Sequence, residues 1–177
     1  MSACLWNDID AALVAAVTAD MTPAGDYEDH IVQTVLVGDT VNPDHHELPL
    51  VLIRGAEAQY GENIIRGDAV YLDGIVYSYD LIAITRTEPD NDDTVTAVTL
   101  RAKAAGNELL RRLRECVRNR PALGISAPAT DGETIDHVRF AGGRGGTTGL
   151  VQVIGFGGVN GGYEVTVQLS IEVAAML

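Results

Sequence analysis

Residues 163–173 alternate strictly between apolar and polar side chains, and this alternation constrains the fold more than any other feature of the sequence. Successive side chains of a β-strand point to opposite faces of a sheet, so a period of two predicts a strand with one buried face. Burial of its apolar side chains, at about 1.5–3 kcal/mol each, gives on the order of 10 kcal/mol of gross stabilisation. We therefore place this strand in the core sheet. Its apolar series is Tyr163, Val165, Val167, Leu169, Ile171 and Val173.

Three further segments predict strands. Residues 135–140 and 150–156 precede the alternating strand and are separated from it and from each other by Gly-rich turns. Residues 48–54 predict a short buried strand, which we expect to be followed by a loop through Gly61 and Gly67.

The dipeptide Asp73-Gly74 lies between two apolar runs, residues 70–72 and 75–87. Asp-Gly in this position is the strongest short-range signal for a β-hairpin, because both central residues of the favoured turn need a positive φ. We therefore expect the chain to reverse at this dipeptide. The better-buried face of the second run is predicted to carry Tyr77, Tyr79, Leu81 and Ala83.

Apolar side chains recur at helical spacing in residues 4–19 and 95–118, and each segment predicts an amphipathic helix. In the first helix, Asp8 and Asp10 are expected to point away from the apolar face. The second helix, about 35 Å long, contains Gly106, which costs about 1 kcal/mol relative to Ala and allows a close approach to the sheet. The apolar series are Leu5, Ile9, Leu13, Ala16 and Val17 in the first helix, and Val98, Ala102, Ala105, Leu109, Leu113 and Cys116 in the second.

Charged residues flank the long helix with the polarity that a helix dipole favours. We expect the carboxylates of the acidic turn at residues 88–93 to cap its N-terminus, while arginines crowd its other end. Dipole compensation is one interpretation of the arginines. The other is a contact with a partner, because a self-assembling subunit of net charge −13 needs its scarce positive charges against a neighbour's carboxylates. The arginines are Arg111, Arg112, Arg114, Arg118 and Arg120.

These elements predict one α+β domain over residues 1–177, with a mixed, mostly antiparallel sheet packed by an N-terminal helix and one long central helix. Residues 20–47 are predicted to be an extended arm or long loop, although residues 31–37 also carry the alternation of an edge strand. Two cysteines, Cys4 and Cys116, are too few for a disulfide framework, and we expect both to be reduced core residues.

The net charge of −13 argues against sequence-specific DNA binding, since such a surface repels phosphate backbones. Residues 1–10 show no basic or long apolar targeting segment, and no later run approaches the roughly 20 apolar residues of a membrane span. We therefore expect a protein of the cytoplasm, or of a particle assembled there.

Sequence motifs give no support for catalysis or cofactor binding. The Gly-rich residues 142–149 lack the Lys-Ser/Thr of a phosphate loop and precede a strand, so we interpret them as a mobile loop with Arg144 near its tip. Adjacent His45 and His46 point to opposite sides of an extended chain, which favours a solvated loop over a metal site. No nucleophile elbow or Cys–His pairing is present. We predict no catalytic residue, no metal ligand and no cofactor.

In the order of its elements the chain resembles the tail terminator proteins of long-tailed bacteriophages, also described as tail completion or head–tail joining proteins. The resemblance covers most of the chain except residues 20–47 and the loop around 142–149. It is carried by an N-terminal helix (5–19), a Pro-containing strand (48–54), a hairpin ending in Tyr79-Asp80-Leu81-Ile82-Ala83-Ile84-Thr85, a long Arg-ended helix (95–118) and the alternating strand (163–173).

The resemblance implies a structural virion protein without enzymatic activity or cofactor, located in the tail or neck and assembled in the host cytoplasm. Six copies would form a ring that caps the tail tube and joins it to the head connector, and genomic DNA would pass through the lumen without specific binding. The implied partners are other copies of the chain, the tail tube protein and head–tail connector proteins, with no membrane. Our candidate contact residues are Arg111, Arg112, Arg114, Arg118, Arg144, Glu164 and Glu172.

Two other functions are consistent with the same pattern. One is a neck adaptor between head and tail, which shares the small mixed fold. The other, of a different class, is a small ligand-binding or enzymatic α+β domain that uses the Gly-rich loops.

Overall fold

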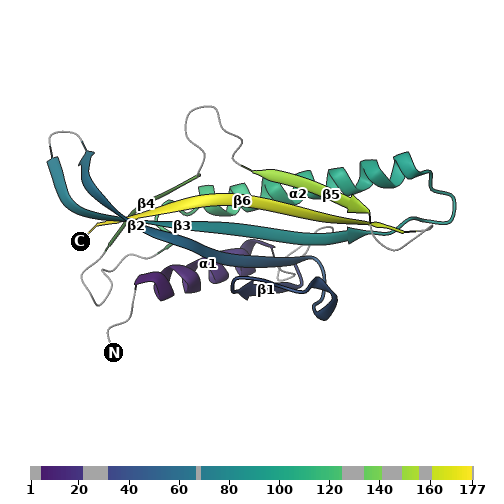
Figure 1. Ribbon diagram of the computed structural model, residues 1–177, viewed down its shortest axis with the longest axis horizontal. Helices are drawn as coiled ribbons and strands as arrows, with labels where there is room; N and C mark the ends of the chain where they lie inside the picture. Colours follow the sequence, from purple (N-terminus) through teal and green to yellow (C-terminus); the bar gives the residue numbers. More distant parts are fainter. Residues whose placement is uncertain are drawn as a thin grey trace.

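A computed structural model describes residues 5–21, 32–66, 69–124, 134–140, 149–155 and 161–176. It contains two α-helices, a short 3-10 helix and one sheet, which confirms the predicted α+β class (Figure 1). The elements are α1 (Leu5–Met21), β1 (Thr34–Val37), η1 (Pro43–His45), β2 (Leu50–Arg66), β3 (Ala69–Thr87), α2 (Val95–Arg118), β4 (Thr134–Phe140), β5 (Leu150–Gly155) and β6 (Tyr163–Met176).

Strand β6, the alternating segment, lies inside the sheet as predicted. One of its edges pairs antiparallel with β3 from Tyr163 to Met176. Its other edge is shared by β5, which pairs with residues 163–168, and β4, which pairs with residues 171–176. The sheet order is β1-β2-β3-β6-β4, and β1 runs parallel to β2, so the sheet is mixed and mostly antiparallel. The sheet is therefore bounded by β1 on one side and by β4 and β5, one after the other along β6, on the other side.

Both helices pack on the same face of the sheet, where they extend along the long strands (Figure 1). This face is built from the odd-numbered residues of β3 and β6, because alternate side chains of a strand share a face. α1 lies against β1 and β2, and α2 lies against β3, β5 and β6. The buried side chains of this core include Ile9, Leu13, Tyr77, Tyr79, Leu81, Leu109, Leu113, Val165, Val167, Leu169, Ile171 and Val173.

Residues 20–47 were predicted to be an arm or a long loop. Within the described part of this stretch, residues 34–37 form the edge strand β1. Residues 38–48 then cross the other face of the sheet, where Val41 and Leu48 pack on a small apolar cluster of Leu50, Leu52 and Ile84. Residues 34–48 are thus part of the domain, and residues 22–31 of the predicted arm lie outside the described residues.

The predicted hairpin turn at Asp73-Gly74 is wrong. Both residues lie within β3, where Gly74 pairs with Gly61 of β2, so the expected loop through Gly61 is also replaced by strand. The reversal lies between Arg66 and Ala69, which pair with each other. The intervening Gly67-Asp68, outside the described residues, is a Gly-led dipeptide of the kind that two-residue hairpin loops also accept. Extending the hairpin from the Gly61–Gly74 pair to the Arg66–Ala69 pair adds backbone hydrogen bonds between β2 and β3. These hydrogen bonds outweigh the local preference of Asp73-Gly74 for a turn.

Two predictions for the helices also need correction. Asp10 does not point away from the core, since its carboxylate accepts a hydrogen bond from the buried Tyr79, and burial raises its pKa. The N-cap of α2 is Thr94, whose hydroxyl accepts from the Ala97 amide at 3.2 Å. Asp90 and Asp93 instead pair with the Arg101 guanidinium, at 3.1 and 2.7 Å. A Thr hydroxyl and an Asp carboxylate can both accept from a helix's first amides, and an Asp can also pair with a nearby arginine. The spacing of charges in the sequence does not show which of these interactions forms.

The close approach expected at Gly106 is confirmed. A Cβ at this position would lie 2.5 Å from Val151 Cγ1 and 2.8 Å from Val165 Cγ1, so α2 meets β5 and β6 with backbone where other residues would place a side chain. Gly149 makes a matching approach, because its Cβ would lie 2.5 Å from Leu110 Cδ1. The absence of a side chain at these two glycines allows α2 to pack closely against the sheet.

Substitution of Gly106 by Ala should lower the free energy of unfolding by about 1 kcal/mol. The added methyl gains about 1 kcal/mol of helix propensity, but overpacking against two branched valines costs about 1–3 kcal/mol. The neighbouring Asn107→Ala is the control, because Asn107 is exposed and should gain about 0.5 kcal/mol from propensity alone. Urea denaturation measures both, and a stabilised Gly106→Ala variant would contradict the close packing.

Candidate functional site

The arginines predicted as contact residues lie in the C-terminal half of α2, and several are held by glutamates of the same helix. Glu108 Oε1 accepts from Arg111 at 2.7 Å and from Arg112 at 2.9 Å, and Arg111 also pairs with Glu115 at 2.6 Å. These pairs span three or four residues, the spacing at which helical side chains become neighbours. The hydrogen bonds from Arg111 and Arg112 lower the pKa of Glu108 to about 2.

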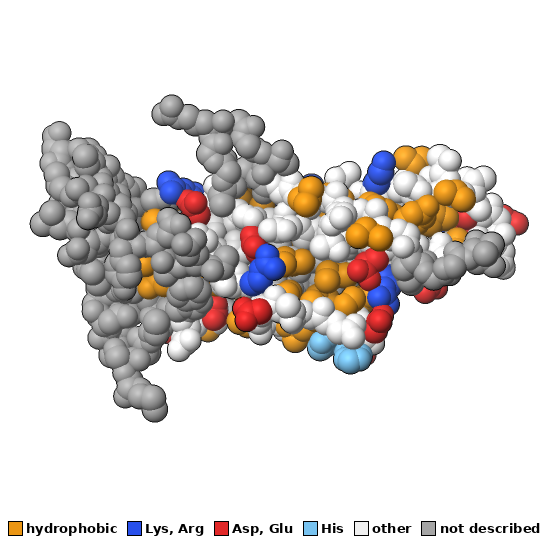
Figure 2. Space-filling model, in the orientation of Figure 1, with side chains coloured by type: hydrophobic (Ala, Val, Ile, Leu, Met, Phe, Trp, Pro, Cys, Tyr) orange, Lys and Arg blue, Asp and Glu red, His pale blue; other side chains and the backbone are white. Residues whose placement is uncertain are grey.

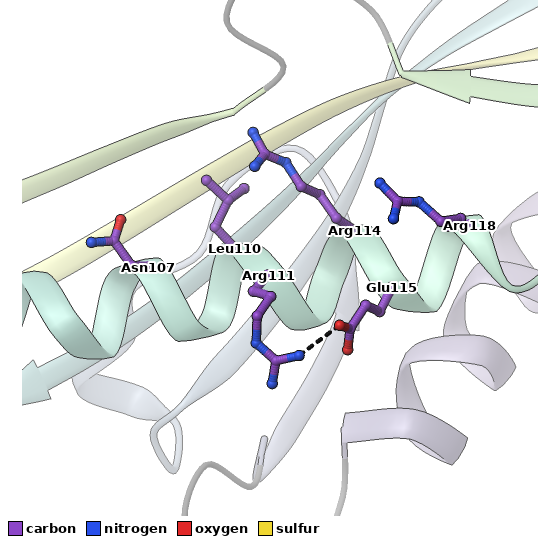
Figure 3. Close-up of a pocket in the computed structure, with 6 residues that line it drawn as sticks. All are labelled: Asn107, Leu110, Arg111, Arg114, Glu115 and Arg118. Carbon is purple, nitrogen blue, oxygen red and sulfur yellow. Dashed lines mark hydrogen bonds and ion pairs between the residues drawn. The ribbon is translucent and has the colours of Figure 1, made fainter.

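Arg114 and Arg118 border an open groove of about 370 Å³ on α2. The residues that line it are Asn107, Leu110, Arg111, Arg114, Glu115 and Arg118. Arg114 and Arg118 extend from the helix on the same side as Leu110, whereas Arg111 turns the other way, toward Glu115 (Figure 3). We call this feature the arginine groove. Leu110 of this groove packs against Gly149, directly before β5.

Arg120, just beyond α2, has a different role from the other arginines. It pairs through both terminal nitrogens with the carboxylate of Asp20 in α1, one of them at 2.7 Å, and it donates to the Cys116 carbonyl at 3.2 Å. The hydrogen bond from Arg120 lowers the pKa of Asp20. Arg120 thus joins the ends of the two helices and compensates the α2 carboxyl terminus, in agreement with the dipole interpretation for this residue.

Glu164 and Glu172, the predicted acidic contact residues, lie on the sheet face away from the helices. Both have partners at neighbouring register positions within the chain: Glu164 pairs with Arg86 at 3.0 Å, and Glu172 pairs with Arg139 at 2.5 Å. Figure 2 shows acidic and basic side chains in mixed groups on one face of the molecule. The structure therefore does not bring these glutamates together with the arginines of α2. Arg144 lies outside the described residues.

The same face carries a polar row across the middle three strands. Arg54 donates to Asp80 at 2.6 Å, and the Ser170 hydroxyl donates to the other oxygen of Asp80 at 2.5 Å. Burial raises the pKa of Asp80, but the hydrogen bonds from Arg54 and Ser170 outweigh it, and the pKa lies below its ordinary value. Cross-strand pairing thus neutralises Arg54 and Asp80 within the chain.

Exposed apolar side chains concentrate at the two sides of the sheet. Val37 on β1 is 50% exposed, and Leu150 and Ile154 on β5 are 58% and 51% exposed. In the described part of the chain, the other large hydrophobic residues with such exposure are Val95 and Leu100, on the first turns of α2. The exposure of the side chains on β1 and β5 could not be predicted from the sequence, because alternation does not show which strands lie at the edges of the sheet.

The β1 side of the molecule also carries acidic groups. Residues 38–47, which we call the acidic segment, follow β1 and expose Asp39, Asp44 and Glu47. The Thr34 hydroxyl donates to the Glu47 carbonyl at 3.0 Å, and Asp44 pairs with Arg86 at 2.6 Å. The two adjacent histidines of this segment are exposed as expected. The acidic segment therefore starts and ends beside β1 and crosses the helix-free face as far as Arg86 of β3.

Within the residues that the structure describes, no three His, Cys, Asp or Glu side chains group closely enough to hold a metal ion. Cys116 is buried in the core as predicted, and burial raises the pKa of its thiol to about 12; Cys4 lies outside the described residues. Neither described helix combines the length and the apolar character that crossing a membrane requires.

The sequence matches no model of a known protein family, and no curated protein is similar to it.

Glu108→Gln should lower the free energy of unfolding by about 0.5–1 kcal/mol at pH 7, because it removes the carboxylate that two arginines share. Since the folded pKa lies near 2 and the ordinary value is 4.5, this stabilisation is complete above pH 4.5 and is lost as pH falls toward 2. Urea denaturation at pH 7, 4 and 3 should show the difference from wild type shrinking.

Glu115→Gln is the matched control, because Glu115 pairs with Arg111 and is half exposed. Its loss at pH 7 should be smaller than that of Glu108→Gln. A Glu108→Gln deficit that stays constant from pH 7 to pH 3 would contradict the shared ion pair.

Proposed function

We propose that this chain is a structural virion subunit, a tail terminator that closes the tail tube of a long-tailed bacteriophage as a homo-oligomeric ring of six copies. In this role it joins the tube to the head connector, has no enzymatic activity and uses no cofactor. The elements on which the resemblance rests occur in the expected order, as α1, β2, β3, α2 and β6.

The observation that carries the proposal is the pair of unlike sheet sides. A contact between two different patches of the same subunit is head-to-tail, and head-to-tail contacts close into rings when the rotation between copies permits. Here β1 ends the sheet on one side and β5 on the other, and each exposes large apolar side chains. An open strand edge with apolar side chains favours association with a second chain.

The charge of the subunit also supports the proposal. A net charge of −13 makes a ring whose lumen repels the phosphate backbone, so DNA passes without sticking. The ion pairs on the helix-free face are formed within the chain, which favours the sides of the sheet, with their exposed apolar side chains, as the contacts between copies.

Mass photometry and sedimentation of the purified chain test the ring. Wild type should populate a species near six times the chain mass of 18.8 kDa. Val37→Asp and Leu150→Asp should each shift the population toward monomer, because each places a charge on an apolar contact. Val95→Asp is the matched control, since Val95 is 74% exposed but lies on α2. It should leave the species unchanged.

A wild-type chain that stays monomeric at all concentrations and binds neither tube nor connector proteins would contradict the proposal. Rings that bind connector proteins but not tube protein would indicate that the subunit is a neck adaptor and not a tail terminator. Thermal stabilisation by a nucleotide or a small acid, without any assembly, would favour a ligand-binding domain instead.

A further inference from the structure

We infer that neighbouring copies join by extending the sheet: β1 of one copy pairs antiparallel with β5 of the next, and the helices of both copies lie on the same face. The inference rests on the proposed homo-oligomer and adds to it the backbone contact through which the copies meet. It also selects β5 over β4, although both strands bound the same side of the sheet.

Strands β1 and β5 lack the features that protect an edge strand from pairing with another chain. Proteins block such pairing with charged side chains, prolines and β-bulges on the edge. The sequences Thr-Val-Leu-Val of β1 and Leu-Val-Gln-Val-Ile-Gly of β5 contain no charged residue and no proline, and the register of both strands is regular. In contrast, β4 contains Asp136 and Arg139, and its register with β6 shifts between Ile135 and His137. By these criteria β4 is a protected edge, and β1 and β5 are open edges.

The outer edges of β1 and β5 have no strand partner in the part of the chain that the structure describes. There β1 pairs only with β2, and β5 pairs only with β6. The chain turns away from the edge after β1, because the Gly38 amide donates to the Ile53 carbonyl of β2 at 3.1 Å. The acidic segment then lies over β2 and β3 on the helix-free face.

The strand directions within one subunit determine how a second copy can continue the sheet. β1 is parallel to β2, and β2, β3, β6 and β5 alternate in direction, so β1 and β5 run in opposite directions. A neighbour that joins its β1 to β5 and keeps its helices on the same face also keeps its strand directions. The new pair is therefore antiparallel, which is slightly more stable per residue than a parallel pair.

The two edges also match in the side chains that they place on each face. The odd-numbered residues of β1 and β5 face the helices, because they are paired with core residues of β2 and β6. In the extended sheet Val37 of one copy therefore joins the row of Val151 of the next. On the helix-free face, Leu36 joins the exposed Leu150 and Ile154. Each face of the new pair thus brings apolar side chains together.

The helix layer continues across the same contact. α1 covers β1 and β2, and α2 is centred on β6 with β3 and β5 on either side, so two and a half strand positions separate the helices. At about 4.8 Å for each strand, this interval is about 12 Å. When β1 of the next copy follows β5, its α1 lies two and a half strand positions beyond α2. The helices are then evenly spaced, without overlap and without a gap.

A second copy of this chain is the occupant that these observations favour over a strand of another protein. One chain supplies both halves of the contact: two open edges of opposite direction, matching apolar rows on each face, and a helix interval that repeats. Because the two edges differ, the contact is head-to-tail and can close into a ring.

Amide hydrogen exchange measured by mass spectrometry tests the backbone contact. Wild type is compared at a concentration that gives rings and after dilution to monomer. Amides of β1 and β5 should exchange at least about tenfold more slowly in the ring, because inter-strand hydrogen bonds protect them. Amides of β4 are the internal control and should exchange equally in both states.

Gln152→Lys tests the same edge by substitution. Gln152 is the exposed polar residue of β5, and a lysine on an edge strand opposes pairing with another strand, so self-association should weaken by at least about tenfold. Thr96→Lys is the matched control, because Thr96 is exposed on α2, and it should assemble as wild type does. Mass photometry across a concentration series gives the dissociation constants, and circular dichroism confirms that each variant is folded.

The outcomes separate this inference from the proposed function. If wild type forms rings and the exchange of β1 and β5 is unchanged, the sides of the sheet do not pair and the inference fails while the ring stands. Protection of β4 in place of β5, or rings of Gln152→Lys with wild-type affinity, would overturn it in the same way. If wild type forms no ring, the proposed function fails and the inference fails with it.

Discussion

The packing of α2 against β6 is the interaction on which the rest of the structure depends. The odd-numbered side chains of β6 from Val165 to Ala175 are buried on the helix-covered face, and Gly106 brings the helix backbone close to Val151 and Val165. Adding or removing side-chain volume between α2 and β6 lowers the free energy of unfolding, because protein interiors are close-packed. With α1 covering β1 and β2 on the same face, the helices complete one core. The opposite face carries cross-strand ion pairs and a smaller apolar cluster of Leu50, Leu52 and Ile84.

The same contact positions the arginine groove. Because α2 packs on β5 and β6, Leu110 reaches Gly149, directly before β5. On the other face, cross-strand pairs such as Arg54–Asp80 satisfy their charges within the chain. In the part of the chain that the structure describes, exposed large apolar side chains lie on β1, on β5 and on the first turns of α2, so the two sides of the sheet are different apolar patches of one subunit. This difference is what a head-to-tail assembly needs.

Much of the fold follows from the sequence because periodic burial is a strong local signal. The alternation of residues 163–173, the helical spacing from Val95 to Arg118 and the close approach at Gly106 are all present in the structure. The hairpin turn was misplaced because Asp73-Gly74 and Gly67-Asp68 both suit a turn, and only the pairing of β2 with β3 selects between them. The N-cap was misassigned because Asp90 and Asp93 of the acidic turn form ion pairs with Arg101, which lies further along the helix, and do not cap its first amides.

The candidate contact residues were less predictable than the fold. The partners of Glu108 follow from its spacing of three and four residues to Arg111 and Arg112, a signal that the sequence does contain. Glu164 and Glu172 appear exposed in the alternating pattern, yet strand order gives them Arg86 and Arg139 as neighbours. Strand order depends on pairing between distant segments, and a single sequence carries little information about it. For the same reason the position of the acidic segment on the helix-free face could not be predicted.

The central claim is that the β1 side of one copy meets the β5 side of the next, and thiol cross-linking tests it most directly. In a Cys4→Ser background, Leu36→Cys and Ile154→Cys together should give a ladder of covalent oligomers with a short bis-maleimide, while the buried Cys116 stays unreactive. A mixture of the two single variants should stop at dimers, because each chain then offers one thiol. Dimers formed by Leu36→Cys alone would indicate a symmetric contact and contradict the account, as would a double variant that does not cross-link.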